Sequence, residues 1–372
     1  MLKLLKYLPD KIGSYSEQDV TFLLRDISHL TIEASTEERE VKIQQGEAHY
    51  SEMLPVEFHP DATYMALYEQ MLDKYASKIA ECVAIVAEKI VALRGIDELV
   101  LVSLARAGTP IGILLKRYFH AAYAVDVPHY SVSIIRGRGI DEAALHYIQA
   151  SHPQANVQFV DGWTGKGAIT KELQEAVAHW NETADKPLDA ELAVLADPGH
   201  CVKLYGTRED FLIPSACLNS TVSGLVSRTV LNDALMEKDD FHGAKFYKEL
   251  SNVDVSNAYI DTIVPYYSND LIREAQVTVQ SSSQEEEPTW RGLRCIDEIQ
   301  RHFGLKNTHH IKPGVGETTR VLLRRVPWKI LVNPAAEQDL AHIYLLAKER
   351  GVEIEAYPNM TYSCCGLIKE LD

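Results

Sequence analysis

The sequence predicts a two-domain α/β protein, in which a mostly parallel sheet flanked by helices precedes a smaller α/β/α sandwich. Two observations predict the first domain: short apolar segments that end in polar or glycine-containing turns, and helical periodicity between them. The apolar segments are residues 99–103, 157–161 and 192–196. Residues 277–288 are rich in Ser, Gln and Glu, which is the composition of a flexible connector. The expected parts are therefore a first domain with an N-terminal arm (1–278), a linker (279–290) and a second domain (291–372).

Composition and charge limit the classes of protein. Apolar residues make up 46% and charged residues 24% of the 372 residues, which is ordinary for a globular protein. A formal net charge of −16 argues against nonspecific coating of nucleic acid, although a local basic face stays open. No apolar run reaches the length of about 20 residues that spans a bilayer, and the first ten residues lack the apolar core of a signal peptide. Six cysteines without a C-x-x-C pair indicate neither a disulfide framework nor a zinc site. We therefore expect a cytoplasmic protein without a membrane partner.

The first elements along the chain are expected to be helical. Residues 19–27 follow Ser16, a good N-cap residue, and are expected to form a helix. Residues 61–93 carry Ala, Leu, Ile and Val at helical spacing and predict a long helix or a pair of helices. The strand at residues 99–103 leads into a loop with Arg106, whose planar guanidinium suits a diphosphate.

The run from Val157 to Thr170 organises the first domain. It predicts a buried strand that ends at Asp161, a loop with three glycines, and a helix from about Thr170. This geometry presents backbone N–H groups and a helix N-terminus to a phosphate, and Asp161 lies where an open α/β sheet has its ligand crevice. A Walker A loop is excluded, because Gly165-Lys166 is followed by Gly167 instead of Ser or Thr.

The second domain is expected to alternate helices and strands. The expected elements are a helix at 292–303, a strand at 307–312, a glycine-rich turn that opens a basic helix at 313–325, a strand at 328–332, a helix at 336–350, a strand at 352–356 and a short tail at 366–369. The glycine-rich turn predicts an anion site, because the N–H groups and the positive dipole end of the helix that follows would be free.

The loop from Val160 to Gly167 resembles the phosphoribosyl pyrophosphate loop of type I phosphoribosyltransferases, with one departure. That family has two adjacent acids at the strand end, and here the second position is Gly162. The resemblance implies that Asp161 binds ribose hydroxyls with Mg²⁺ and that Asp161 and Arg106 are catalytic. It implies substrate contacts from several strand-end loops, namely Ser103, Ala107, Gly108, Thr109, Gly162, Trp163, Thr164, Gly165, Lys166, Gly167, Ala168, Arg136, Arg138 and Asp197. The alternative interpretation of Arg136 and Arg138 is that they cap a hairpin.

The segment from Lys312 to Arg320 resembles the turn and helix start of the Pelota-type RNA-binding fold. The resemblance implies RNA contacts from Lys312, Gly314, Gly316, Glu317, Thr318, Arg320 and Arg324. From Arg301 to Asp372 there are ten Lys or Arg against eight Asp or Glu, a local reversal of the chain's acidic balance that suits phosphate. A helix whose arginines are only solvated is the alternative.

Together the two halves resemble a bacterial two-domain family that joins a phosphoribosyltransferase-like domain to a Pelota-like domain and is associated with tellurite-resistance and stress-response gene clusters. The resemblance implies phosphoribosyl transfer from phosphoribosyl pyrophosphate to or from a base, with Mg²⁺ as cofactor, RNA as partner and a homodimer as an option. Members also carry the label cysteine protease StiP, so a cysteine peptidase is one alternative. Its candidate pairs combine Cys201, Cys217 or Cys365 with His49, His200 or His242. A nucleotide- or RNA-binding sensor without catalysis is the other alternative.

Overall fold

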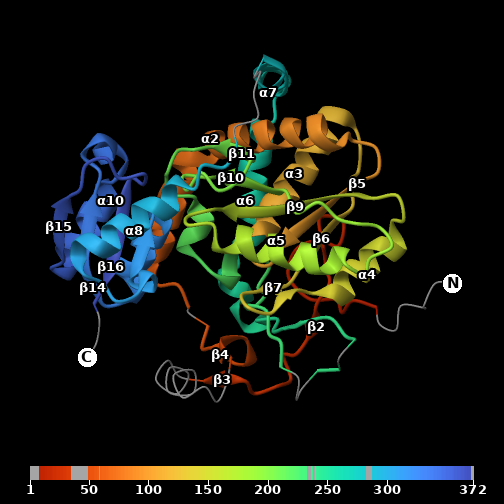
Figure 1. Ribbon diagram of the computed structural model, residues 1–372, viewed down its shortest axis with the longest axis horizontal. Coiled ribbons are helices and arrows are strands. Elements are labelled where there is room, and N and C mark those ends of the chain that lie inside the picture. Colours follow the sequence, from red (N-terminus) through yellow and green to blue (C-terminus); the bar gives the residue numbers. More distant parts are fainter. Residues whose placement is uncertain are drawn as a thin grey trace.

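The computed structural model of the chain describes residues 8–34, 49–57, 59–232, 236–237, 239–281 and 287–369. A large domain built on a six-stranded sheet lies beside a small domain built on a four-stranded sheet (Figure 1). The predicted class is confirmed at this level: a mixed α/β protein with a mostly parallel sheet, flanking helices and a smaller C-terminal domain. Within the described ranges, the structure contains no helix with the length and apolar character needed to cross a bilayer.

The strands of the large sheet run parallel in the order β1-β6-β5-β9-β10-β11. In that order they span Thr21–Phe22, His129–Val132, Leu99–Leu104, Asn156–Trp163, Leu192–Ala196 and Leu204–Thr207. Every residue of β5 is buried, because helices cover both faces of the sheet. All these strands end at one edge, so the loops after β5, β9 and β10 are neighbours there.

Side chains of the central strands alternate between two hydrophobic cores on opposite faces of the sheet. On β5, Leu99 and Leu101 pack into the core that α2 and α3 cover, whereas Val100 and Val102 pack into the core that α4 and α5 cover. This two-residue period is the geometry of a strand buried on both faces. The helices of the large domain are α2 (Ala62–Arg94), α3 (Gly108–Tyr123), α4 (Glu142–Ser151), α5 (Ala168–Asn181), α6 (Ser256–Ile263) and α7 (Asn269–Ser281).

The long helix expected over residues 61–93 is confirmed as α2, and its ends have clear causes. The Asp61 side chain accepts a hydrogen bond from the backbone N–H of Tyr64, and Gly95 follows the last turn with a φ of 71°. Short elements complete the large domain: the strand pairs β2 (Arg25–Asp26) with β12 (Gly243–Ala244), β3 (Glu33–Ala34) with β4 (Leu54–Pro55) and β7 (Ile134–Ile135) with β8 (Gly139–Ile140), and the 3₁₀ helices η1 (Tyr50–Glu52), η2 (Pro214–Cys217), η3 (Ser220–Val222), η4 (Lys248–Val253) and η5 (Val264–Tyr266).

The small domain has strand order β13-β16-β14-β15, in which only the β14–β15 pair is parallel. Its elements in chain order are α8 (Arg291–Phe303), η6 (Thr308–His310), β13 (Ile311–Pro313), α9 (Val315–Arg324), β14 (Pro327–Val332), η7 (Pro334–Asp339), α10 (Ala341–Arg350), β15 (Glu353–Ala356) and β16 (Cys364–Ile368). The segment expected to be a short tail is therefore an interior strand, β16, paired on both sides.

The expected helix at residues 19–27 is wrong, because this segment forms β1 and β2. Phe22 and Leu24 pack into one core and Leu23 into the other, which is the alternation of an extended chain. The backbone N–H of Leu23 donates to the carbonyl of Ser131, so the β6 edge takes the hydrogen bonds that a helix would have made internally.

Two other expected boundaries shift. Helix α7 continues to Ser281, three residues into the segment expected as linker from residue 279. The helix expected at 336–350 is divided, because the 3₁₀ helix η7 occupies its beginning and α10 starts at Ala341.

Candidate functional site

The loops after β9 and β10 contact the small domain at the carboxyl edge of the large sheet. The hydroxyl of Tyr362 donates to the carbonyl oxygen of Gly165 over 2.9 Å, and the N–H of Gly292 donates to the carbonyl of Gly199 over 2.9 Å. Lys166 crosses the interface as well, since its Nζ donates to the carbonyl of Thr308 over 2.9 Å. The edge at which an open α/β sheet binds ligands is therefore covered by the second domain.

Asp210 of the large domain anchors the first turn of α9 in the small domain. Its Oδ1 accepts the N–H of Val315 over 3.0 Å and its Oδ2 accepts the N–H of Ser363 over 2.8 Å. Burial raises the pKa of Asp210 to about 6, against these backbone hydrogen bonds, which favour the carboxylate. A carboxylate from one domain thus occupies the positive end of a helix in the other.

A cavity of about 200 Å³, here called the Asp161 cavity, lies between the domains. Its lining includes Arg106, Asp161 and Trp163 from the large domain and Glu317 and Arg320 from the small domain. Burial raises the pKa of Asp161 to about 7, although the Gly162 N–H donates to its Oδ1 over 2.7 Å. The two residues predicted to be catalytic therefore face one cavity, and the segment predicted to bind RNA forms its opposite wall.

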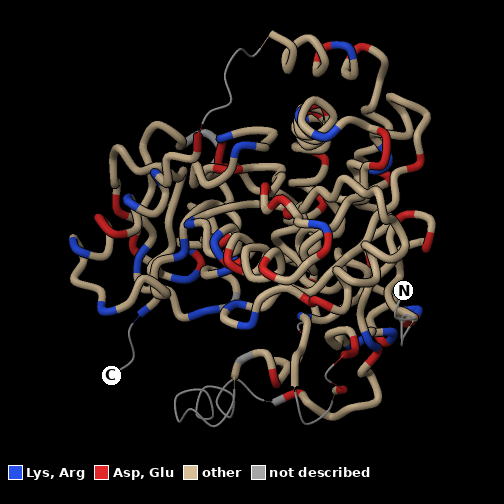
Figure 2. Tube along the Cα trace, turned by 45° about the vertical axis from the view of Figure 1, so that its right-hand side comes forward, with Lys and Arg blue, Asp and Glu red and all other residues tan. Residues whose placement is uncertain are grey.

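A second cavity of about 220 Å³, here called the basic cleft, lies on another side of the glycine loop. The large domain contributes Arg136 and the loop from Thr164 to Thr170, and the small domain contributes His309 and Lys312. Burial, together with the nearby charges of Lys312 and Arg136, lowers the pKa of Lys166 to about 8. Figure 2 shows basic positions gathered in the small domain and where it meets the large one.

A third cavity, of about 320 Å³, lies beside Cys201. It is lined by Thr170 of α5 and by Glu287 and Trp290 of the segment that leads into the small domain. The Trp290 N–H donates to the carbonyl of His200 over 2.9 Å, which holds this segment against the loop after β10. Burial raises the pKa of the Cys201 thiol to about 12.

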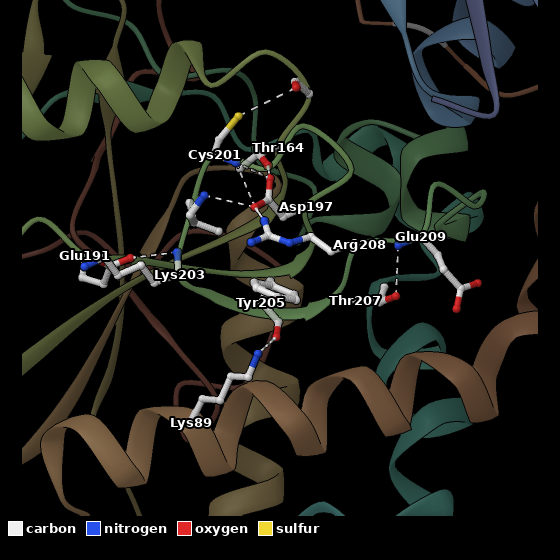
Figure 3. Close-up of polar contacts among 12 residues, drawn as sticks. Lys89, Thr164, Glu191, Asp197, Cys201, Lys203, Tyr205, Thr207, Arg208 and Glu209 are labelled. Atoms are coloured by element: carbon white, nitrogen blue, oxygen red, sulfur yellow. Dashed lines mark hydrogen bonds and ion pairs between the residues drawn. The ribbon is translucent and has the colours of Figure 1, made fainter. Parts of the chain in front are cut away.

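Asp197 organises the loop that carries Cys201 (Figure 3). The backbone N–H groups of Cys201 and Val202 donate to its carboxylate over 2.9 Å and 3.0 Å. The Thr164 hydroxyl also donates to Asp197, and Arg208 forms an ion pair with it. Asp197 is fully buried, so these four partners supply the hydrogen bonds that its charge needs inside the protein.

Several predicted substrate-binding residues point elsewhere. Ser103 is buried and its hydroxyl bonds to Nε2 of His129, and the buried Thr109 hydroxyl bonds to that of Ser131. Arg138 forms an ion pair with Glu52 over 2.8 Å, while the β7–β8 turn itself is held by Glu172. The buried Asp197 lines none of the three cavities. The other predicted positions divide between the Asp161 cavity (Arg106, Ala107, Asp161, Gly162, Trp163), the basic cleft (Arg136, Trp163, Thr164, Gly165, Lys166, Gly167, Ala168) and the packing contact between the start of α3 and β9 (Gly108).

Two of the N–H groups expected to be free at the glycine-rich turn of the small domain are used within the protein. The N–H of Gly314 donates to the carbonyl of Cys364, and the N–H of Val315 donates to Asp210. Thr318 is fully buried, and the side chain of Arg324 lies outside the described part of the structure. Lys312, Gly316, Glu317 and Arg320 line the two interdomain cavities. The two sites that the sequence predicts separately are thus one composite region.

The expected Mg²⁺ ligand is a single carboxylate. In the ranges that the structure describes, no three His, Cys, Asp or Glu side chains gather as a metal site. Asp161 accepts a backbone N–H and is the one predicted ligand, so the residues present do not form a metal cage. Mg²⁺ binding therefore stays a prediction.

These features define a two-domain α/β protein whose ligand edge is closed by its own C-terminal domain. Residues 13–264 match the family described as "Tellurite-like stress resistance cysteine protease StiP", and residues 290–370 match the PELOTA RNA binding domain. A protein of Acinetobacter baylyi named "Cysteine protease StiP" is 36% identical over 351 residues, which cover 90% of this chain and 88% of that protein. The chain belongs to the StiP family.

The family corrects the predicted activity. Both the family description and the relative's name are those of a cysteine protease, so the prediction of a phosphoribosyltransferase is wrong and the cysteine peptidase alternative is favoured. The predicted Pelota-like part and the association with stress resistance are confirmed at the level of these matches. The sequence did not indicate Trp290 and Asp210, because each acts through a contact with the other domain. Thr170 was predicted to lie at the start of a helix, but not to line a cavity.

Proposed function

We propose that this chain is a cysteine peptidase that acts through Cys201 and carries an RNA-binding C-terminal domain. Its membership of the StiP family supports the first part, and the match of residues 290–370 to the PELOTA RNA binding domain supports the second. We also propose, from the predicted boundaries, that residues 1–278 and 291–372 are separate domains of a cytoplasmic stress-resistance protein. The finer likeness of the large sheet to type I phosphoribosyltransferases stays a prediction about fold.

The choice of Cys201 follows from where the cysteines lie. The region that matches the StiP family contains Cys82, Cys201 and Cys217. Cys82 belongs to the middle of α2, where Gly206 of β11 packs against it, and Cys217 ends η2 inside the main core. Cys201 lies in a strand-end loop and lines a cavity, as a nucleophile must if a substrate is to reach it.

The position of Cys201 against the start of α5 is the observation that carries the proposal. Gly167, the N-cap of α5, has a φ of 72°, and a Cβ built on it would lie 3.0 Å from the Cys201 Sγ. The first N–H groups of a helix have no acceptor within the helix, and its dipole favours negative charge at this end. A thiolate at this place would therefore be stabilised, and the N–H groups could also receive the oxyanion of an acyl intermediate.

In the proposed reaction the Cys201 thiolate attacks the carbonyl carbon of a peptide bond. The tetrahedral intermediate collapses with cleavage of the C–N bond, the leaving amine takes a proton from water, and a thioester remains on Sγ. Water then hydrolyses the thioester, which releases the acid and restores the thiol. The overall reaction is the hydrolysis of one peptide bond and needs no cofactor.

The arrangement described here is a latent one. Cys201 is 1% exposed, and burial, the largest cause, raises the thiol pKa to about 12, with the charge of Asp197 adding to the effect. The thiol donates to the carbonyl of Gly165 over 3.9 Å, and the Trp290 ring packs on Gly167 beside it. Movement of the Trp290 segment would both admit a substrate and lower the thiol pKa towards its ordinary value.

Two of the three candidate histidines, His49 and His242, form hydrogen bonds elsewhere, and none of the three lines the cavity beside Cys201. Nδ1 of His49 lies 2.7 Å from the Ser51 hydroxyl, and Nδ1 of His242 lies 2.8 Å from the Ser133 hydroxyl. Neither residue lines the cavity beside Cys201. The cations whose charges favour the Cys201 thiolate are Arg208 and Lys171. We therefore propose activation by the helix end and these cations instead of a preformed Cys–His pair.

The test uses the full chain with Trp290→Ala, which uncovers the thiol, and labelled casein as an unspecific protein substrate. Hydrolysis is expected for Trp290→Ala and is expected to be lost in Trp290→Ala/Cys201→Ser. Trp290→Ala/Cys217→Ser is the matched control, because it removes another buried thiol of the same domain and should keep the activity. Absence of hydrolysis by Trp290→Ala, in a preparation whose Cys201 is shown to react with iodoacetamide, would refute the peptidase proposal.

A further inference from the structure

The basic cleft is an electropositive cavity to which both domains contribute. Arg136 lies in the turn between β7 and β8, Lys166 in the loop that precedes α5, and His309 and Lys312 in the small domain at η6 and β13. Among the described residues that line it, Glu317 is the one carboxylate, and it forms an ion pair with Arg320 over 3.1 Å. Four basic side chains and a single carboxylate therefore line a cavity of about 220 Å³.

These basic groups repel one another. The charges of Lys312 and Arg136 lower the pKa of Lys166, and those of Lys166 and Lys312 lower the pKa of His309, in each case after burial as the largest cause. Bringing like charges together at a partly buried place costs free energy, which an anion in the cavity would offset.

Thr170 gives an independent indication of a ligand. It lines both the basic cleft and the cavity beside Cys201, is 3% exposed, and its Oγ1 has no hydrogen-bond partner within the described structure. A buried hydroxyl without a partner is unfavourable, so the site fits a ligand oxygen that would accept its proton.

We propose that the basic cleft binds the terminal phosphate of an RNA strand that the small domain carries. One wall of the cleft consists of His309 and Lys312, which lie in the region that matches the PELOTA RNA binding domain. The cleft is a cavity of limited volume between two domains, which suits the end of a strand better than a strand that passes through it. The inference depends on the RNA-binding part of the proposed function and not on its peptidase part.

The test compares two RNA strands that differ in one group. A 12-nucleotide strand with a 5′-monophosphate and the same strand with a 5′-hydroxyl are titrated against the full chain at fixed salt concentration, by fluorescence anisotropy from a 3′ label. The wild type is expected to bind the phosphorylated strand about tenfold more tightly, the effect of about one charge-assisted hydrogen bond. The 3′-phosphorylated strand, labelled internally, shows which end enters.

The variants Arg136→Gln and Lys312→Gln separate a cleft contact from general RNA binding. Each should remove most of the preference for the phosphorylated strand. Arg136→Gln is safe for folding, because the Glu172 carboxylate holds the turn through the N–H groups of Gly137 and Gly139. Arg301→Gln is the matched control: it removes one charge from the exposed side of α8 and should keep the preference.

Each outcome decides the proposal. Equal binding of the unphosphorylated strand and of both the 5′- and the 3′-phosphorylated strands by the wild type would overturn it, while RNA binding by the small domain would stand. A preference that survives in both cleft variants would overturn the assigned place. If adenosine monophosphate displaces the strand as well as a phosphorylated dinucleotide does, the site takes free nucleotides and the RNA assignment fails. A peptidase result, positive or negative, leaves these measurements unchanged.

Discussion

Replacing Trp290 by alanine should uncover the Cys201 thiol and accelerate its alkylation. In the wild type, the Trp290 ring and the Cys201 Sγ both pack against Gly167, and Cys201 is 1% exposed. Lys171 lies over the indole ring, with its Nζ 5.1 Å from the ring centroid, which adds a further contact that holds the ring in place. Removal of the ring opens the cavity beside the sulfur to the reagent.

The size of the effect follows from the thiol pKa. At pH 8 a thiol with a pKa of about 12 is about one ten-thousandth thiolate, whereas an ordinary thiol with a pKa of about 8.5 is about one quarter thiolate. A more basic thiolate reacts faster, with a Brønsted slope of about 0.4–0.5, and this offsets part of the difference. Cys201 in the folded wild type should therefore react about a hundredfold more slowly than in the denatured chain.

The assay is a time course with iodoacetamide at pH 8, followed by digestion and mass spectrometry of each cysteine peptide. Trp290→Ala should raise the Cys201 rate at least about tenfold, and Trp290→Phe, which keeps a ring over the sulfur, should stay close to wild type. Cys217 is fully buried in another core and should not change in either variant. The reasoning is refuted if wild-type Cys201 reacts almost as fast as in the denatured chain, or if Cys217 accelerates together with Cys201.

Three further predictions concern buried charge. Burial raises the pKa of Asp161 from its ordinary value near 4 to about 7. Between these pH values the folded state keeps a proton that the unfolded chain releases. The free energy of unfolding therefore falls as pH rises from 4 to about 7, by at most about 4 kcal/mol. Asp161→Asn should therefore unfold at higher urea than wild type at pH 8 and close to wild type at pH 4, and an equal difference at both pH values would contradict this. Arg208→Met leaves the buried Asp197 carboxylate without its ion-pair partner and should lower the unfolding free energy by about 3–5 kcal/mol, whereas Lys78→Met at an exposed ion pair should change it by less than about 1 kcal/mol. Binding of phosphorylated RNA should weaken between pH 7 and pH 9, because Lys166, with a pKa of about 8, loses its charge in this range. If binding by the Lys166→Met variant shows the same pH dependence as binding by the wild type, Lys166 is excluded as the cause.

Local sequence patterns were sufficient for the architecture of the large domain. The short apolar runs at residues 99–103 and 157–161 are typical of strands buried on both faces, and β5 and the interior of β9 are such strands. The uninterrupted helical period of residues 61–93 produces α2 almost residue for residue. Such patterns predict the element correctly because backbone geometry within one element decides which residues share a face. In a strand every second residue lies on the same face, and in a helix every third or fourth residue does. Where burial depended on a distant edge, as for residues 19–27, the pattern predicted the wrong element.

The candidate sites needed the tertiary structure. The sequence by itself located the loop from Thr164 to Thr170 and the turn at Gly314 as anion-binding candidates, because glycine and a helix start are local features. It did not show that Asp210 already occupies the turn at Gly314, or that Trp290 lies beside Cys201. These contacts join residues that are far apart in the chain, and they depend on how two domains pack. No local period encodes that packing, so the placement of Lys312 opposite Lys166 and the cover over the thiol were decided only by the fold as a whole.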